Sequence, residues 1–284
     1  MKFIKGLENL SKQEITLKKL IFDPPLLNEK KSDFNSQNHK IIILDTETTG
    51  LDVVQDEIIE IAFQVYHLNL ESGKLEEQIT FYQELQEPRK PLSPIIEKIT
   101  GLKTSDLHGK KIDWKYVEMV CGKCDFIISH NADFDRQFIS KYFKLDPKVK
   151  YLCSCDLIDW EYLGFGSRKL ELICLFHGFY YDSHRAMSDV NALSKLIELN
   201  CEILGRTYLK EILLNSELKY FYLEAHFAPF EKKDLLKQRG YRWEPNSKLW
   251  KLKVSEKNLD VETQWISKEI YTQANRSKVI PINN

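Results

Sequence analysis

Two acidic residues directly after an apolar stretch are the first candidates for chemistry in this sequence. Residues 41–44 (Ile-Ile-Ile-Leu) are typical of a strand buried on both faces, and Asp45 and Glu47 follow them. Because side chains alternate along a strand, both carboxylates point to the same side. Two hard oxygen ligands suit Mg²⁺ or Mn²⁺. A strand that simply runs into an acidic, threonine-rich turn would show the same pattern.

A second candidate lies at the start of a predicted helix. Residues 126–129 indicate a short buried strand, and Asn131 follows as the predicted N-cap of a helix that carries Asp135 one turn inside. A helix N-terminus at a sheet edge favours anions, so a phosphate could lie nearby. A helix with a solvated acidic first turn remains the alternative.

A histidine and an aspartate five residues apart form the third candidate. Asp189 is predicted early in a helix whose apolar positions face the core, and His184 lies in the loop before it. A loop would let the imidazole swing over a metal site. A lone histidine in a loop is more often a surface residue, so the spacing to Asp189 decides its interpretation.

Several predicted elements would hold these stretches in place. Strand composition at 58–66 and 78–82 predicts an antiparallel meander with the first strand, and 151–156 is the predicted fifth strand. Short helices are predicted at 91–101, 113–120 and 167–178. Before them, Ser11 and Glu14 form a capping-box pattern that predicts a helix through Leu20, and the polar stretch 28–39 is typical of a linker. We therefore predict an N-terminal helix and linker at 1–38.

Composition limits the class of protein. The chain has 284 residues, is 43% hydrophobic and carries a formal net charge of −1, which fits one large and one small globular domain. No apolar run approaches the ~20 residues of a membrane span, and the start lacks the apolar region of a signal peptide. We expect a soluble, cytoplasmic protein without a membrane partner, whose six cysteines are reduced thiols. Binding of nucleic acid would depend on local patches and metal.

The composition changes after about residue 217. Strands at 220–227, 241–243 and 249–254 and helices at 229–239 and 261–274 predict a small βαββα accessory domain over 217–275. Residues 230–284 contain 12 Lys and Arg against 7 Asp and Glu. Arg242, Trp243 and Trp250 combine a cation with aromatic rings, as in surfaces that bind single strands. Alternatively, the tryptophans form the core of the small domain.

Together the three stretches resemble a known family. The chain is similar to the DnaQ-like 3′-to-5′ exonucleases, typified by the proofreading subunit or domain of bacterial replicative DNA polymerases and including ribonuclease T and oligoribonuclease. The family pattern is Asp-x-Glu, then His-Asn-Ala-x-Phe-Asp, then His-x-Ala-x-x-Asp. These motifs occur here, in that order, with Asp45, Glu47, Asp135, His184 and Asp189 at the matching positions. The resemblance covers about residues 39–204, and we predict an exonuclease domain over 39–206.

The resemblance implies both a fold and a mechanism. The fold is ribonuclease H-like α/β, with a five-stranded mixed sheet flanked by helices. Two divalent cations, Mg²⁺ or Mn²⁺, would be held by Asp45, Glu47, Asp135 and Asp189, and His184 would take the proton from the attacking water. The segment after Asp45 would line the pocket for the terminal nucleotide through Thr46, Thr48, Thr49, Gly50 and Leu51, with weaker candidate contacts at His130, Asn131 and Phe134.

The implied function is removal of nucleoside 5′-monophosphates, one at a time, from a nucleic acid with a free 3′ end. We predict single-stranded DNA as the polymer, because the Thr-Thr-Gly-Leu segment at 48–51 and the Ile-Thr-Gly segment at 99–101 look closest to the proofreading branch. The alternatives are an exoribonuclease of the ribonuclease T or oligoribonuclease type and a non-catalytic module that binds nucleic acid or a polymerase. A proofreading role would need a separate polymerase or another replication or repair protein as partner.

Overall fold

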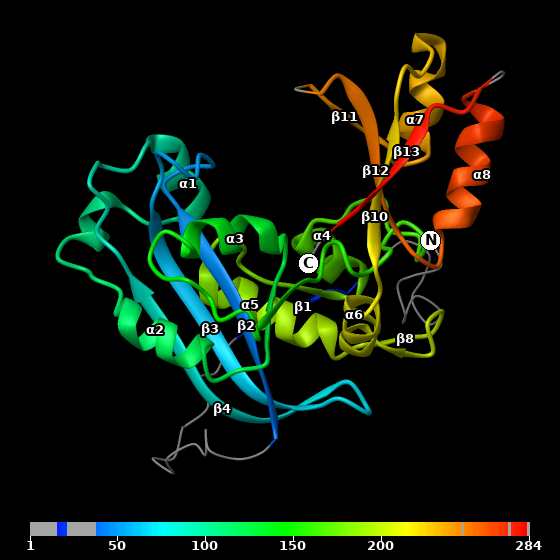
Figure 1. Cartoon of the computed structure of the whole chain (residues 1–284). Helices are drawn as coiled ribbons and strands as arrows, with labels where there is room; N and C mark the ends of the chain where they lie inside the picture. The colour runs from blue at the N-terminus through cyan, green and yellow to red at the C-terminus, as the bar shows by residue number, and fades with distance from the viewer. Residues whose placement is uncertain (1–15, 22–37, 246, 272–273, 283–284) are drawn as a thin grey trace. The chain divides into compact units, whose positions relative to one another are not determined.

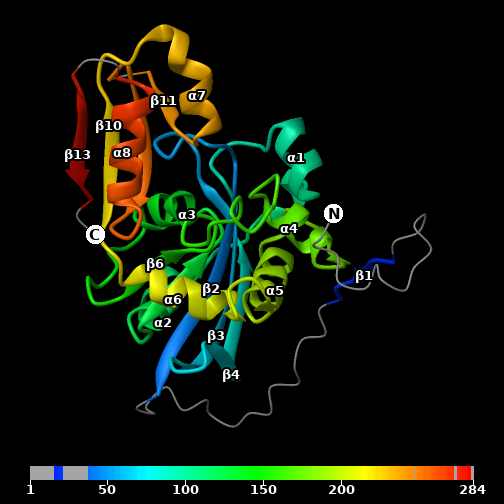
Figure 2. The same cartoon turned by 90° about the vertical axis from the view of Figure 1, so that its right-hand side faces the viewer.

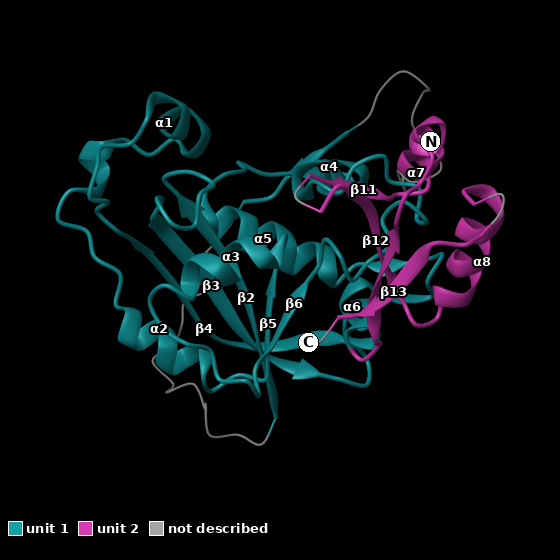
Figure 3. Ribbon diagram, turned by 45° about the horizontal axis from the view of Figure 1, so that its top comes forward, with its two compact units in different colours: residues 1–216 teal, residues 217–284 magenta. Residues whose placement is uncertain are grey.

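The computed structural model describes residues 16–21, 38–245, 247–271 and 274–282. The chain divides into two compact units, residues 1–216 and 217–284, which are coloured separately in Figure 3. Each unit is described by itself below. Within the described residues, no helix combines the length and the apolar character needed to cross a membrane. All six cysteines are free thiols.

The centre of unit 1 is a five-stranded mixed sheet in the order β4-β3-β2-β5-β6 (Figure 1). Strands β2, β3 and β4 form the antiparallel meander, and β5 and β6 continue the sheet parallel to β2. The predicted α/β fold with a five-stranded mixed sheet is therefore confirmed. The strands are β2 (His39–Thr48), β3 (Ile58–Asn69), β4 (Lys74–Leu85), β5 (Phe126–Ser129) and β6 (Lys150–Cys153).

Helices cover both faces of this sheet (Figure 2). Ile42 and Leu44 of β2 point to one face, where they join a core with Val117 and Phe138 from two of the helices. Because side chains alternate, Asp45 and Glu47 share the opposite face, on which α5 contacts β2 and β3. The helices of unit 1 are α1 (Pro94–Thr100), the 3₁₀ helix η2 (Thr104–Leu107), α2 (Trp114–Cys121), α3 (Ala132–Ile139), α4 (Leu170–Phe176), α5 (Ala186–Ile197) and α6 (Tyr208–Ser216).

The N-terminal segment is extended where a helix was predicted. Strand β1 (Lys18–Lys19) pairs in parallel with β7 (Phe179–Tyr180), and the Leu20 N–H donates to the carbonyl of Tyr180 at 2.7 Å. The helix prediction is wrong for residues 18–20, because pairing with a distant strand outweighs a local capping pattern. Ser11, Glu14 and nearly all of the predicted linker lie outside the described residues.

Short elements complete unit 1 around its last helix. Strands β8 (Asn200–Cys201) and β9 (Arg206–Thr207) form a small antiparallel pair that leads into α6. Tyr208, at the start of α6, lies 2.9 Å from His177 through its hydroxyl and packs on Trp160 with the ring centroids 5.0 Å apart. These contacts make α6 an integral part of unit 1.

Unit 2 is a four-stranded sheet in the order β11-β12-β10-β13, with both helices packed on one face. Its core contains Leu223 and Val254 from the sheet and Leu236 and Ile266 from the helices. The predicted elements of this region form, and β13 adds an edge strand that the sequence analysis did not predict. The elements are β10 (Tyr220–Ala225), the 3₁₀ helix η3 (Phe230–Lys232), α7 (Lys233–Gln238), β11 (Arg242–Glu244), β12 (Leu249–Ser255), α8 (Leu259–Glu269) and β13 (Ser277–Pro281).

Candidate active site

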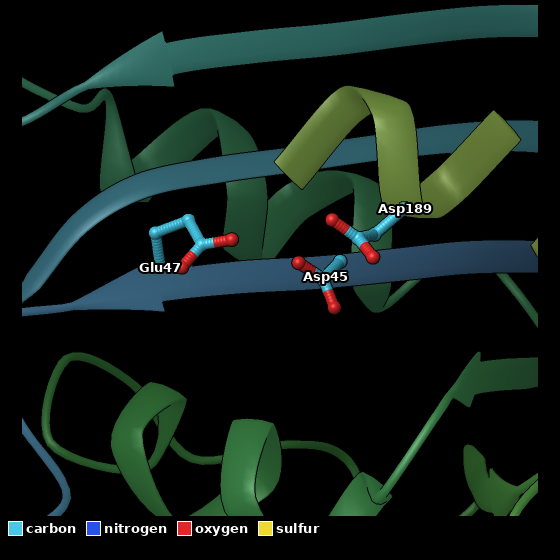
Figure 4. A group of neighbouring side chains, drawn as sticks. All are labelled: Asp45, Glu47 and Asp189. Carbon is cyan, nitrogen blue, oxygen red and sulfur yellow. The ribbon is translucent and has the colours of Figure 1, made fainter. Parts of the chain in front are cut away.

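Three carboxylates from two elements converge over the C-terminal half of β2. Asp45 and Glu47 lie on β2 and Asp189 lies on α5, as Figure 4 shows. One carboxylate oxygen from each residue can be chosen so that all three lie within 4.8 Å of one another. All three side chains are half-buried. The structure therefore brings together residues that are more than 140 positions apart in the sequence.

The Asp189 carboxylate is fixed by three hydrogen bonds. The Tyr181 hydroxyl donates to Oδ1 at 2.8 Å, and the backbone N–H groups of His184 and Arg185 donate to Oδ2 at 2.9 and 3.2 Å. His184 has a left-handed backbone conformation with φ 67°, which is uncommon for a residue other than glycine. We attribute this conformation to the need to aim two consecutive N–H groups at one carboxylate oxygen.

Helix α5 is held over the sheet by an ion pair with a buried glutamate. Arg185, the residue before α5, donates from Nε and Nη2 to the two carboxylate oxygens of Glu60 on β3, each at 3.1 Å. The first N–H group of the helix, that of Ala186, donates to the same carboxylate at 3.3 Å. Glu60 is fully buried and also accepts from Gln83 at 2.7 Å. Glu60 therefore caps α5 from a neighbouring strand and sets the height of Asp189 above the sheet.

A second polar network fixes α5 one turn further along. The Gln64 amide on β3 donates to the side chain of Asn191 at 2.7 Å and accepts from the Ser194 hydroxyl at 2.9 Å. Gln64 and Ser194 are buried. The helix is thus attached to β3 at two places, which limits its rotation and its translation relative to Asp45 and Glu47.

Asp135 approaches the site from α3 on the other side of β2. It is 2% exposed, and its Oδ1 accepts a hydrogen bond from the Thr46 hydroxyl at 2.7 Å. Thr46 lies between Asp45 and Glu47 and therefore points to the opposite face of the strand. Asp135 is close enough for its charge to raise the pKa of Asp45, although it is not one of the three converging carboxylates.

Burial and mutual repulsion disfavour ionisation of these acids. Burial, and then the charges of Asp189 and the other acidic neighbours, raise the pKa of Asp45 well above its usual range. The same two causes raise the pKa of Glu47 to about 8. Burial raises the pKa of Asp135 to about 7 and that of Asp189 to about 6. A positive charge placed among these groups would relieve this repulsion.

This set of ligands fits a hard divalent cation. All the converging atoms are carboxylate oxygens, and the described residues place no histidine or cysteine in the same group. Mg²⁺ and Mn²⁺ favour such oxygen ligands and bind through a few carboxylates together with substrate phosphates. The half-buried position leaves room for a substrate oxygen to reach the same cation.

His184 is placed at the edge of the site. Its side chain is exposed and its backbone is bonded to Asp189. The imidazole and Asp189 therefore share one segment, which runs from Tyr181 into the first turn of α5. An exposed imidazole beside a carboxylate cluster is suited to accept a proton from water.

The segment after Asp45 forms a turn that is stabilised by side-chain hydrogen bonds. The Thr48 hydroxyl donates to the Gly50 carbonyl at 2.6 Å, and the Thr49 hydroxyl donates to Asp56 at 2.9 Å. A Cβ atom at Gly50 would clash with the Asp56 carboxylate, so only glycine fits there without a shift. Leu51 follows with 84% of its surface exposed, which leaves its apolar side chain free to contact a ligand.

Of the three weaker candidates from the second motif, His130 and Phe134 have structural contacts. His130 lies 2.9 Å from the Ser154 hydroxyl and 2.7 Å from the Arg168 carbonyl, so both ring nitrogens are occupied away from the carboxylates. Phe134 packs on Phe138 with the ring centroids 4.8 Å apart. Asn131 occupies the N-cap position of α3, but its φ is 71° and its side chain makes no cap hydrogen bond. The expected side-chain cap is therefore absent.

Two supporting groups, Tyr181 and Glu60, were not predicted from the sequence. Glu60 is the one charged residue in the apolar run 58–63, and a charge in a strand buried on both faces must be paired. That signal indicates an ion pair but not its partner, Arg185. The hydrogen bond from Tyr181 to Asp189 depends on the loop conformation, for which the sequence holds no comparable signal.

The three accessory candidates in unit 2 do not share one surface. Trp250 is half-buried against the core of unit 2, and Trp243 meets it edge-on with the ring centroids 5.5 Å apart. Arg242 is exposed and alternates with Trp243, so it points to the opposite face of the sheet. The structure thus separates the cation from the two indole rings.

Comparison with known proteins places this geometry in a family. The model of the Exonuclease family, RNase_T, matches residues 42–197, which contain all five of the predicted catalytic residues. Similar curated proteins include DNA polymerase III PolC-type from Thermotoga petrophila, 27% identical over 66% of this chain, and from Thermotoga maritima, 29% identical over 69% of this chain. This chain spans only 14% of the length of each of these polymerases.

Solved structures show the same fold. One structure of exonuclease I aligns over 86% of this chain and 64% of its own, with a TM-score of 0.55 and 16% identity. A zinc-bound complex of Escherichia coli exonuclease I with single-stranded DNA aligns over 87% of this chain and 64% of its own, with a TM-score of 0.53 and 14% identity. The match to the family model covers more than half of the residues, and the chain therefore belongs to the exonuclease family.

Proposed function

We propose that this chain is a metal-dependent 3′-to-5′ exonuclease that releases nucleoside 5′-monophosphates from single-stranded DNA. The observation that carries the proposal is the convergence of Asp45, Glu47 and Asp189 within 4.8 Å in a member of the exonuclease family. DNA is supported by the names of the relatives, which are DNA polymerases, and by the complex of exonuclease I with single-stranded DNA. The same relatives suggest a context of DNA replication or repair.

The family resemblance suggests a role for each acidic residue, and the convergence of Asp45, Glu47 and Asp189 supports the role of these three. Asp45, Glu47 and Asp189 would hold one cation, and Asp45 with Asp135 would hold a second. Bound divalent cations neutralise the carboxylates and stabilise the charge that develops on the attacking and leaving oxygens of a phosphodiester.

The remaining residues bind the substrate and move the proton. His184 would take a proton from the attacking water at a ring nitrogen, since its side chain is exposed beside Asp189. The Thr48–Leu51 turn would receive the terminal nucleotide, with Leu51 against its base. Because Tyr181 and the loop backbone fix Asp189, the carboxylate keeps one orientation while the substrate enters.

The test compares DNA and RNA of one sequence, each labelled at the 5′ end, with Mg²⁺ or Mn²⁺. We expect nucleoside 5′-monophosphate as the product and faster hydrolysis of DNA. Faster hydrolysis of RNA would instead establish the exoribonuclease alternative, because only contacts to the 2′-hydroxyl distinguish the two polymers. His184→Ala should bind Mn²⁺ as the wild type does and lose turnover, and near-full activity of that variant would exclude its role as the base.

A further inference from the structure

The sheet of unit 2 has one face that carries no helix. Phe221, Leu223 and Ala225 of β10 point toward α7 and α8 and join the core. The alternate residues Tyr220, Tyr222 and Glu224 therefore point to the opposite, open face. Tyr222 lies on β10, one of the two central strands of the sheet, and its side chain is 39% exposed.

The register of the sheet places basic residues from the other three strands on the open face. On β12, Lys251 lies opposite Glu224 and Lys253 lies opposite Tyr222. On the edge strands, Arg242 of β11 lies opposite Lys251, and Lys278 of β13 lies opposite Glu224. The open face is defined by two tyrosines, four basic residues, two glutamates, one leucine and one isoleucine: Tyr220, Tyr222, Glu224, Arg242, Glu244, Leu249, Lys251, Lys253, Lys278 and Ile280.

The cations and the rings of the open face are interleaved. Lys253 Nζ lies 5.0 Å from the ring centroid of Tyr220, and Lys251 Nζ lies 5.7 Å from that of Tyr222. Two acids share this face: Glu244 lies at the end of β11, and Glu224 is bound by Lys251 at 3.2 Å and lies 2.8 Å from the His226 ring. The charge of Glu224 is therefore compensated within the face, and the four basic residues outnumber the two acids and leave the face positive.

We infer that the open face of unit 2 binds single-stranded DNA, with bases stacked on Tyr220 and Tyr222 and phosphates at Arg242, Lys253 and Lys278. Aromatic rings beside cations are the combination that tolerates any base and follows a charged backbone. A four-stranded sheet that presents aromatic rings on its helix-free face is a known arrangement for binding unstacked bases. The positive charge complements a polyanion; of the two aliphatic residues of the face, Ile280 is 40% exposed and Leu249 is buried.

This inference moves the expected contacts away from the tryptophans. Trp243 and Trp250 alternate with the open-face residues and belong to the helix side of the sheet. The choice of DNA as the polymer rests on the proposed function, whereas the location of the face does not.

The test measures binding by the full chain in EDTA, which prevents hydrolysis, with a labelled single strand and a duplex of about 20 nucleotides. The variants are Tyr222→Ala, which removes a ring, and Lys253→Glu, which reverses a charge. Phe230→Ala and Lys233→Glu are the matched controls. They belong to an exposed aromatic–lysine pair, with 4.2 Å between Nζ and the ring centroid, in the η3–α7 segment away from the open face.

We expect Tyr222→Ala to raise the dissociation constant for the single strand by about fivefold or more, and to leave duplex binding unchanged, because paired bases cannot stack on it. Lys253→Glu should weaken single-strand binding and reduce its salt dependence. The controls should match the wild type. Unchanged single-strand binding by Tyr222→Ala, or an equal loss in the controls, would overturn the inference.

Hydrolysis of a short substrate distinguishes failure of the open-face inference from failure of the proposed function. Hydrolysis of a dinucleotide with Mn²⁺ depends on the carboxylate site and should be the same in the wild type and in Tyr222→Ala. If the wild type hydrolyses neither the dinucleotide nor a long strand, the proposed function fails, and the binding experiment still decides the role of the open face.

Discussion

Asp189 differs from the other two converging carboxylates in how firmly it is held. Three donors bind its two oxygens, and one of them is the phenol of Tyr181. Burial raises the pKa of Asp189, and the hydrogen bond from Tyr181 is the largest opposing effect. Tyr181 therefore acts as a positioning residue that also favours the ionised carboxylate.

We predict that Tyr181→Phe lowers kcat/KM at pH 7 by about tenfold, which corresponds to the loss of one hydrogen bond to a charged group. The pKa of Asp189 should rise, so the acidic limb of the pH–rate profile should move to higher pH. Tyr180→Phe, which changes the exposed neighbour, should behave as the wild type. A pH–rate profile of Tyr181→Phe that superimposes on the wild type would contradict this role.

The raised pKa values of the site also link folding to pH. Glu47 has a pKa of about 8 in the folded chain and about 4.3 when unfolded, so between these values the folded state binds more protons than the unfolded state. The free energy of unfolding therefore falls as the pH rises from about 4 to about 8. Asp135 and Asp189, with pKa values of about 7 and 6, contribute in the same direction.

We predict that Glu47→Gln becomes progressively more stable than the wild type as the pH rises from about 4.5 to 8 in the absence of metal. Thermal unfolding of both proteins across this range is the measurement. Mn²⁺ should raise the Tm of the wild type more at pH 8 than at pH 5.5, because it binds the ionised carboxylates. A constant difference between the two proteins at all pH values would contradict the raised pKa of Glu47.

For individual residues, the sequence predicts the metal-ligand candidates better than the residues that hold them in position. Alternation along a strand is enough to place Asp45 and Glu47 on one side. The meeting with Asp189 depends on how α5 crosses the sheet, which only the family resemblance indicated. The occupied ring of His130 could not be foreseen, because its partners Ser154 and Arg168 lie on other segments.

Among the elements, α5 receives the cap at its N-terminus from a neighbouring strand. No side chain caps it locally, and Glu60 on β3 binds both its first N–H group and Arg185. In the register of the two strands Glu60 lies opposite Glu47, so without Arg185 two carboxylates would face each other uncompensated. The same ion pair therefore fixes the helix and separates the structural acid from the metal-ligand candidate.

We predict that Glu60→Gln reduces the free energy of unfolding by about 1–3 kcal/mol, the range for leaving a buried polar group without its partner. Turnover should fall as well, because α5 carries Asp189. Glu57→Gln is the control. It disrupts a more exposed pair, with 2.9 Å between Glu57 and Arg89, and such pairs contribute about 0–1 kcal/mol. Equal losses in urea unfolding would show that Glu60 does not hold the helix.

The elements that form as predicted are those with a strong local pattern. Strands β2, β3 and β5 contain continuous apolar runs, and the helix that carries Asp189 has helical periodicity. Strand β1 was missed because two residues form a strand only when β7 is beside them. Strand β13 was missed because it is a short edge strand that ends at Pro281.

In the whole molecule, each of the two units carries one of the two proposed sites for a single polymer. Unit 1 contains the carboxylate cluster, and unit 2 contains the open face. Two weak sites on one chain bind a strand more tightly than either does alone, provided that the strand can reach both. The division falls after Ser216, where α6 ends, so the expected start of the accessory domain near residue 217 provides a place to separate the units.

We predict that a fragment ending at Ser216 keeps the hydrolysis of a dinucleotide within about twofold and shows a KM for a strand of about 20 nucleotides that is raised about fivefold or more. A cut at residue 212 would remove half of α6 and is expected to destabilise unit 1. Circular dichroism of the fragment serves as the folding control. An unchanged KM for the long strand would exclude a contribution of unit 2 to substrate binding.

The most direct test of the carboxylate site is hydrolysis of a 5′-labelled single strand by the wild type and by Asp189→Asn, with Mn²⁺ and with products resolved by length. We expect a ladder that shortens from the 3′ end with the wild type. We expect no ladder with Asp189→Asn, which removes one of the three converging carboxylates and keeps the shape of the side chain. A full ladder with the variant, or no ladder with the wild type on either DNA or RNA, would contradict the proposed exonuclease site.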